Sequence, residues 1–149
     1  RARLNRDINL LENRNTALVD KLLEAYPALL EYFKSGSREP ALMDMLDYIE
    51  DLSLKRLSEF RFLDRSEALE LSKERSRLEF LRYKAETQAL KISLMESLDR
   101  SLKARKVACE DADCGSFSAP LEQRRVKLGK LIESSRASQE YLTGLIKSK

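Results

Sequence analysis

The sequence contains no histidine and no tryptophan, and it has only four glycines in 149 residues. Without histidine, the chain cannot build a Ser-His-Asp triad, a Cys-His pair or a histidine-based metal site. Four scattered glycines cannot form the loop that cradles phosphate groups. Carboxylates are abundant, but they are spread among lysines and arginines, as on a solvated helix face. We therefore expect neither an enzyme nor a cofactor or metal site.

Long apolar runs and sheet-forming residues are also scarce. No apolar stretch approaches the roughly 18 residues that a membrane-spanning helix needs. Aromatic residues make up 7% of the chain, and valine occurs only at Val19, Val107 and Val126, which argues against a β-sheet. Hydrophobic residues still reach 42%, enough to build a core, and charged residues reach 36% with a net charge of only +3. These proportions predict an all-α fold.

Apolar residues recur at helical spacing along most of the chain, and they predict three helices, at about 4–34, 41–108 and 120–146. The first turn lies between Ser35 and Pro40. Gly36 suits the left-handed position after a helix, and Pro40 suits the first turn of the next one. A loop at 109–119 precedes the last helix. We expect a single all-helical module.

The stretch 41–108 lacks both glycine and proline, so as one helix it would be roughly 100 Å long. Apolar residues are sparse between Asp64 and Arg77, and Asp64 and Glu67 have the spacing of a helix cap. Two architectures fit. We favour an elongated antiparallel helical bundle or coiled coil with one very long central helix, which is thin enough to predict a homodimer. The alternative is a compact up-down-up-down four-helix bundle with a break near residues 64–67.

Several larger side chains in the helices are expected to pack inside the fold rather than to bind a ligand. Leu90, Leu94 and Leu98 widen the apolar face of the long helix. The aromatic residues expected in the core or at helix ends are Tyr26, Tyr32, Phe33, Phe60, Phe62, Phe80 and Tyr83.

Cys109 and Cys114 are the only cysteines, and both fall in the predicted loop. Four intervening residues allow their Cα atoms to come within bonding reach, so we expect a disulfide and an oxidising compartment. The alternative is two reduced thiols in the cytosol. Asp111, Asp113 and Glu122 partly match a calcium-binding loop, but Gly115 is one place early and Pro120 interrupts the pattern. We prefer a solvated acidic loop.

Basic residues cluster at the end of the long helix and at the start of the last one. They would form one patch if the last helix folded back, and such a patch could bind anionic lipid or nucleic acid. Interleaved aromatic residues are lacking, so a solvated face is preferred and nucleic acid is not expected. The patch residues are Lys103, Arg105, Lys106, Arg124, Arg125, Lys127 and Lys130.

These features lead to a hypothesis about architecture rather than chemistry. We expect a non-enzymatic helical interaction module, the extracytoplasmic ligand- or partner-binding region of a bacterial membrane-associated protein, similar to a sensor domain. Its partner would be another protein or a second copy, with an unidentified small ligand as a further option. Membrane contact would come from flanking segments or from the basic patch. The alternatives are a cytosolic coiled-coil adaptor, scaffold or secretion chaperone, and a basic helical dimer on anionic membranes or nucleic acid.

Overall fold

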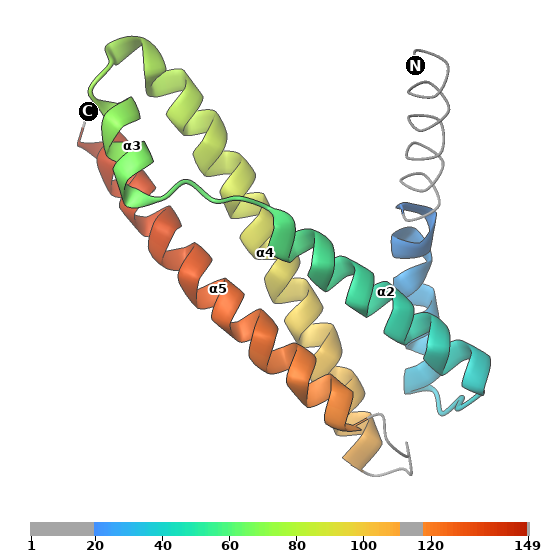
Figure 1. Cartoon of the computed structure of the whole chain (residues 1–149). Helices are drawn as coiled ribbons and strands as arrows, with labels where there is room; N and C mark the ends of the chain where they lie inside the picture. Colours follow the sequence, from blue (N-terminus) through green and yellow to red (C-terminus); the bar gives the residue numbers. More distant parts are fainter. Residues whose placement is uncertain (1–19, 111–117, 149) are drawn as a thin grey trace, which may run out of the picture. The chain divides into compact units, whose positions relative to one another are not determined.

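The computed structural model describes residues 20–110 and 118–148, and this part of the chain is helical without any strand. The all-α helical bundle is therefore confirmed (Figure 1). The chain divides into two compact units, residues 1–53 and 54–149, which are described separately below. A single module remains a prediction. The elements are a helix at 20–34, α2 (Pro40–Glu59), α3 (Arg65–Ser72), the short 3₁₀ helix η1 (Arg75–Arg77), α4 (Leu78–Glu110) and α5 (Ser118–Lys147).

The turn in the first unit has the expected chemistry. Gly36 adopts a φ of 109°, a left-handed conformation that favours glycine, just after the helix at 20–34. α2 then begins at Pro40, as predicted. Arg38 supports the turn: its guanidinium lies 4.1 Å from the centre of the Phe33 ring and donates a 2.6 Å hydrogen bond to the Phe33 carbonyl oxygen.

A small core forms within the first unit. Met43 and Leu46 of α2 are buried, whereas Met45 is exposed. Glu50 is also fully buried, and its Oε2 accepts a 2.6 Å hydrogen bond from the Tyr26 hydroxyl. The other buried apolar residues of this unit are Leu30, Phe33 and Ile49.

The prediction of a single helix over 41–108 is wrong. α2 ends at Glu59, residues 60–64 are not helical, and α3 is followed by a second interruption at Lys73 and Glu74. One long helix does remain: α4 has 33 residues and would extend about 50 Å. The alternative prediction placed a break near 64–67, which is close to the observed interruption at 60–64.

The first interruption has two visible causes. The backbone N–H of Leu63 donates a buried 2.7 Å hydrogen bond to Oε1 of Gln88 on α4, so it is not available to a continuous helix. Asp64 then caps α3, because its Oδ1 accepts a 2.8 Å hydrogen bond from the N–H of Glu67. The predicted cap spacing is confirmed. Within the break, the rings of Phe60 and Phe62 pack edge to face, with their centres 4.7 Å apart.

The cap predicts a specific pH dependence. The hydrogen bond from the Glu67 N–H is the main reason that the pKa of Asp64 lies below its ordinary value of 3.8. The carboxylate therefore contributes stability above the unfolded-state pKa, and this contribution is lost as the pH falls through the lower folded-state pKa. Asn also caps helices but does not titrate. We expect the stability advantage of wild type over Asp64→Asn to shrink between about pH 5 and about pH 2 in urea unfolding. An advantage that does not change with pH would contradict this role, and Asp64→Ala controls for loss of the cap itself.

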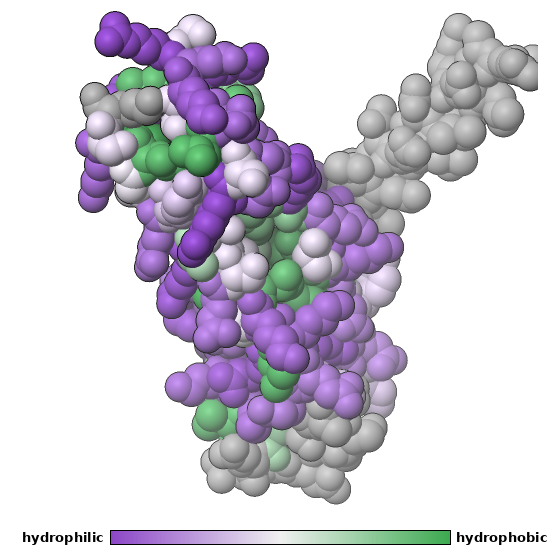
Figure 2. Space-filling view, turned by 60° about the vertical axis from the view of Figure 1, so that its left-hand side comes forward, coloured by the Kyte–Doolittle hydropathy of each residue, from purple (hydrophilic) through white to green (hydrophobic). Residues whose placement is uncertain are grey.

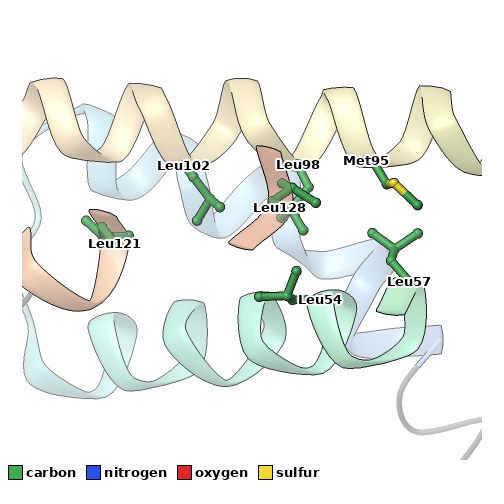
Figure 3. Packing of buried hydrophobic residues seen from close by; sticks show 7 residues of the cluster. All are labelled: Leu54, Leu57, Met95, Leu98, Leu102, Leu121 and Leu128. Carbon is green, nitrogen blue, oxygen red and sulfur yellow. The ribbon is translucent and has the colours of Figure 1, made fainter. Parts of the chain in front are cut away.

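The second unit is built on α4 and α5, which run antiparallel and side by side (Figure 1). α5 confirms the last predicted helix, because both of its ends lie within two residues of the expected range 120–146. One apolar cluster joins the end of α2 to both helices (Figure 3) and consists of Leu54, Leu57, Met95, Leu98, Leu102, Leu121 and Leu128. A second cluster, around α3, consists of Leu63, Ala68, Leu81 and Leu142.

Candidate functional site

α4 carries apolar residues on two different sides. One side faces the core and contributes the buried residues Leu81, Ile92, Met95, Leu98 and Leu102. The other side carries residues that we call the α4 stripe: Phe80, Tyr83, Thr87, Leu90 and Leu94. Four of these are large and exposed, at 40% for Phe80, 63% for Tyr83, 60% for Leu90 and 48% for Leu94. A surface helix normally needs only the first of these two faces.

The residues of the α4 stripe follow one another at alternating spacings of three and four. This is the spacing of the two apolar positions in a heptad, and it keeps all five side chains on one side of the helix over roughly 20 Å. Single exposed apolar residues are ordinary, but a continuous row is typical of an interaction surface. Figure 2 shows one face of the molecule, on which hydrophilic residues predominate and apolar residues form separate groups. The α4 stripe is therefore the candidate functional site.

Charged residues border the α4 stripe, with opposite signs on its two sides. Glu79 and Glu86 precede stripe residues on one side, and both are exposed. Lys84 and Lys91 lie on the other side and are half-buried. The Lys84 ammonium is 5.8 Å from the centre of the Phe80 ring, and that of Lys91 is 5.4 Å from the Phe60 ring.

The expected core is confirmed only in part. Among the aromatic residues expected in the core or at helix ends, Phe33 is buried, whereas Tyr83 is exposed within α4. Tyr32 and Phe80 are also exposed, but both lie close to the end of a helix, which the prediction allowed. Leu90 and Leu94 do not extend the buried face as expected, whereas Leu98 does. The sequence does carry a signal for both faces, because Phe80–Leu94 and Leu81–Leu102 form two interleaved rows at helical spacing.

A buried amide network on the core side of α4 was not foreseen. Gln88 is fully buried, and its Oε1 accepts the hydrogen bond from Leu63 described above. Its Nε2 donates to Oε1 of Gln139 on α5 at 2.9 Å, and Nε2 of Gln139 donates to the carbonyl oxygen of Ala85 at 2.7 Å. The network therefore joins the break before α3 to both long helices. Gln88 falls in the register of the buried row, which was the available clue.

The structure divides the predicted basic patch. Arg105 is fully buried, whereas Lys103, Lys127 and Lys130 are exposed. α5 does fold back along α4, as the patch required. Acidic residues on both helices, however, lie close to the basic ones and pair with some of them. The interhelical ion pairs of this region include Lys106–Glu122 at 2.5 Å, Arg125–Asp99 at 3.6 Å and Arg136–Glu96 at 2.6 Å. Hydrogen bonding from the Lys106 ammonium holds the pKa of Glu122 below its ordinary value. The exposed positive charge is thus partly neutralised.

The cysteine pair and most of the acidic loop lie outside the described residues. Cys109 is half-buried at the end of α4 and packs against the first apolar cluster. Cys114, Asp111, Asp113 and Gly115 fall in 111–117, so the disulfide remains a prediction. Within 20–110 and 118–148, no three side chains of the metal-binding types come together in a site.

A surface hollow of about 490 Å³ lies beside the turn between α3 and α4. Ser72, Glu74 and Arg75 contribute to its polar lining. The Ser72 hydroxyl already donates to the Leu69 carbonyl oxygen at 2.7 Å, and Glu74 pairs with Arg77 at 3.0 Å. These groups serve the turn between α3 and α4, and the hollow does not replace the α4 stripe as the candidate site.

No protein-family model, curated protein or solved structure matches this chain. In the part of the chain that the structure describes, no helix combines the length and hydropathy required for crossing a membrane.

Proposed function

We propose that this chain is a non-enzymatic helical interaction module that binds a protein partner through the α4 stripe. The observation that carries the proposal is a row of four large, exposed apolar side chains at heptad spacing, with the smaller Thr87 at its centre. Covering apolar surface is favourable by about 25 cal/mol per Å², and a helical partner can cover such a row along its whole length.

The fold also supports binding by preparing the helix in advance. α4 is held against α5 by the first apolar cluster, by the amide network and by interhelical ion pairs. A partner helix would therefore meet a surface that is already ordered, and little conformational entropy would be lost on this side of the interface. The sensor-like, extracytoplasmic setting is also part of the proposal, and the all-helical architecture and the cysteine pair motivate it.

A photo-crosslinking amino acid at Leu90 tests the proposal in the cells that make the protein. We expect a discrete crosslinked adduct with the photoreactive group at Leu90, because a partner would lie directly over this position. The matched control carries the group at Lys127, which is exposed on α5 and lies off the α4 stripe. It should give no adduct of the same mass. If Leu90 yields no adduct under conditions in which the protein is folded, the proposed function is wrong.

A further inference from the structure

Resting on the proposed function, we further propose that the partner of the α4 stripe is a second copy of this chain, bound in parallel and in register. The heptad positions can be assigned from the stripe itself. Phe80, Thr87 and Leu94 occupy position a, and Tyr83 and Leu90 occupy position d. This assignment places the bordering charges at the two positions that flank a coiled-coil seam.

The flanking charges form a repeated and self-complementary pattern. Glu79 and Glu86 occupy successive g positions, and Lys84 and Lys91 occupy successive e positions. In a parallel pair of helices, each g residue lies beside the e residue of the following heptad in the other helix. Glu79 would then face Lys84 of the second copy, and Glu86 would face Lys91 of the second copy. Symmetry repeats both pairs, so every one of these charges meets its opposite.

An antiparallel pair would place the same residues in conflict. There, g positions face g positions and e positions face e positions, so glutamates would oppose glutamates and lysines would oppose lysines. Like charges at such positions are destabilising. The charge pattern therefore favours the parallel arrangement. It also favours a second copy as the partner, because the glutamates on one side of the α4 stripe match the lysines on its other side.

The two glutamates are available for this pairing. Both are exposed, and neither forms an ion pair with another of the described residues. Among the described residues, the Lys84 ammonium makes a cation–π contact with the exposed Phe80 ring of its own chain. The seam covers about two heptads, so we infer an association that depends on concentration and on salt rather than a permanent dimer.

A charge-swapped variant tests both the partner and its direction. The variant combines Glu79→Lys, Lys84→Glu, Glu86→Lys and Lys91→Glu and leaves the net charge unchanged. It is mixed in equal amounts with isotope-labelled wild type, and the species are counted by native mass spectrometry. Parallel pairing predicts that each protein associates with itself, while mixed dimers fall at least about tenfold below the statistical half, because all four cross-chain pairs become like-charged.

The other outcomes each overturn the inference. An excess of mixed dimers would show antiparallel pairing, and a statistical mixture would show that these charges do not guide association. If wild type remains monomeric at all concentrations, a second copy is not the partner. The control variant, Lys127→Glu with Glu133→Lys, changes exposed charges on α5 and should mix statistically with wild type. If the charge-swapped variant does not fold, Glu79→Lys with Glu86→Lys, at exposed positions only, should self-associate about tenfold more weakly than wild type. An unchanged affinity would overturn the inference.

The crosslinking experiment separates this inference from the proposed function. An adduct at Leu90 with the mass of two copies supports both. An adduct of another mass keeps the interaction module but replaces the second copy by a different protein. Absence of any adduct contradicts both.

Discussion

Leu102→Ala is expected to lower the free energy of unfolding by about 2–5 kcal/mol. Leu102 is almost fully buried in the first apolar cluster, where side chains from α2, α4 and α5 meet. Truncation removes its contacts and leaves a cavity that the surrounding helices can close only in part. Urea unfolding followed by far-ultraviolet circular dichroism measures the change, because loss of the cluster should shift the midpoint while the helical signal of the folded state is retained.

Leu90→Ala is the matched control for this prediction, since it makes the same substitution on the same helix. Leu90 is 60% exposed, so its truncation should cost less than about 1 kcal/mol in dilute solution, where the monomer predominates. Equal losses for the two variants would contradict the assignment of two faces to α4.

Gln88→Leu is expected to lower the free energy of unfolding by about 1–3 kcal/mol, although it places an apolar side chain of similar size in the core. The substitution leaves the buried N–H of Leu63 without an acceptor and removes the donor to Gln139. An unsatisfied buried donor loses its hydration without a compensating hydrogen bond. Because Leu63 lies in the break before α3, hydrogen exchange should accelerate first in residues 60–72.

The control for the amide network is Gln123→Leu, which makes the same substitution at an exposed glutamine of α5. It should leave stability within about 0.5 kcal/mol of wild type. If Gln88→Leu were as stable as Gln123→Leu, the network would not hold the segment before α3, and the physical reason given for the break in the long helix would fail.

The helices that the sequence predicted best are those whose ends carry local signals. Gly36 and Pro40 mark the first turn through their own backbone preferences, and Asp64 marks the start of α3 through its cap. The end of α2 at Glu59 has no such signal. The non-helical segment after it is held by Gln88, which lies 25 positions away from Leu63 in sequence, so neighbouring residues carry no sign of this contact.

The candidate site was harder to foresee because hydrophobicity does not say which side of a helix is covered. Two residues of α4 illustrate this: Leu90 and Ile92 are both apolar and lie two positions apart, yet only Ile92 is buried. The outcome depends on where α5 and the end of α2 pack. Arg105 is missing from the exposed basic residues for a related reason, since it falls on the side of α4 that faces the core.

We propose that the α4 stripe joins molecules while the opposite face holds one molecule together. Sedimentation velocity over a range of concentrations separates these two roles when wild type is compared with Leu90→Glu. We expect the sedimentation coefficient of wild type to rise with concentration, whereas Leu90→Glu stays monomeric with the same circular dichroism spectrum. A wild-type coefficient that does not depend on concentration, or a Leu90→Glu variant that associates like wild type, would contradict it.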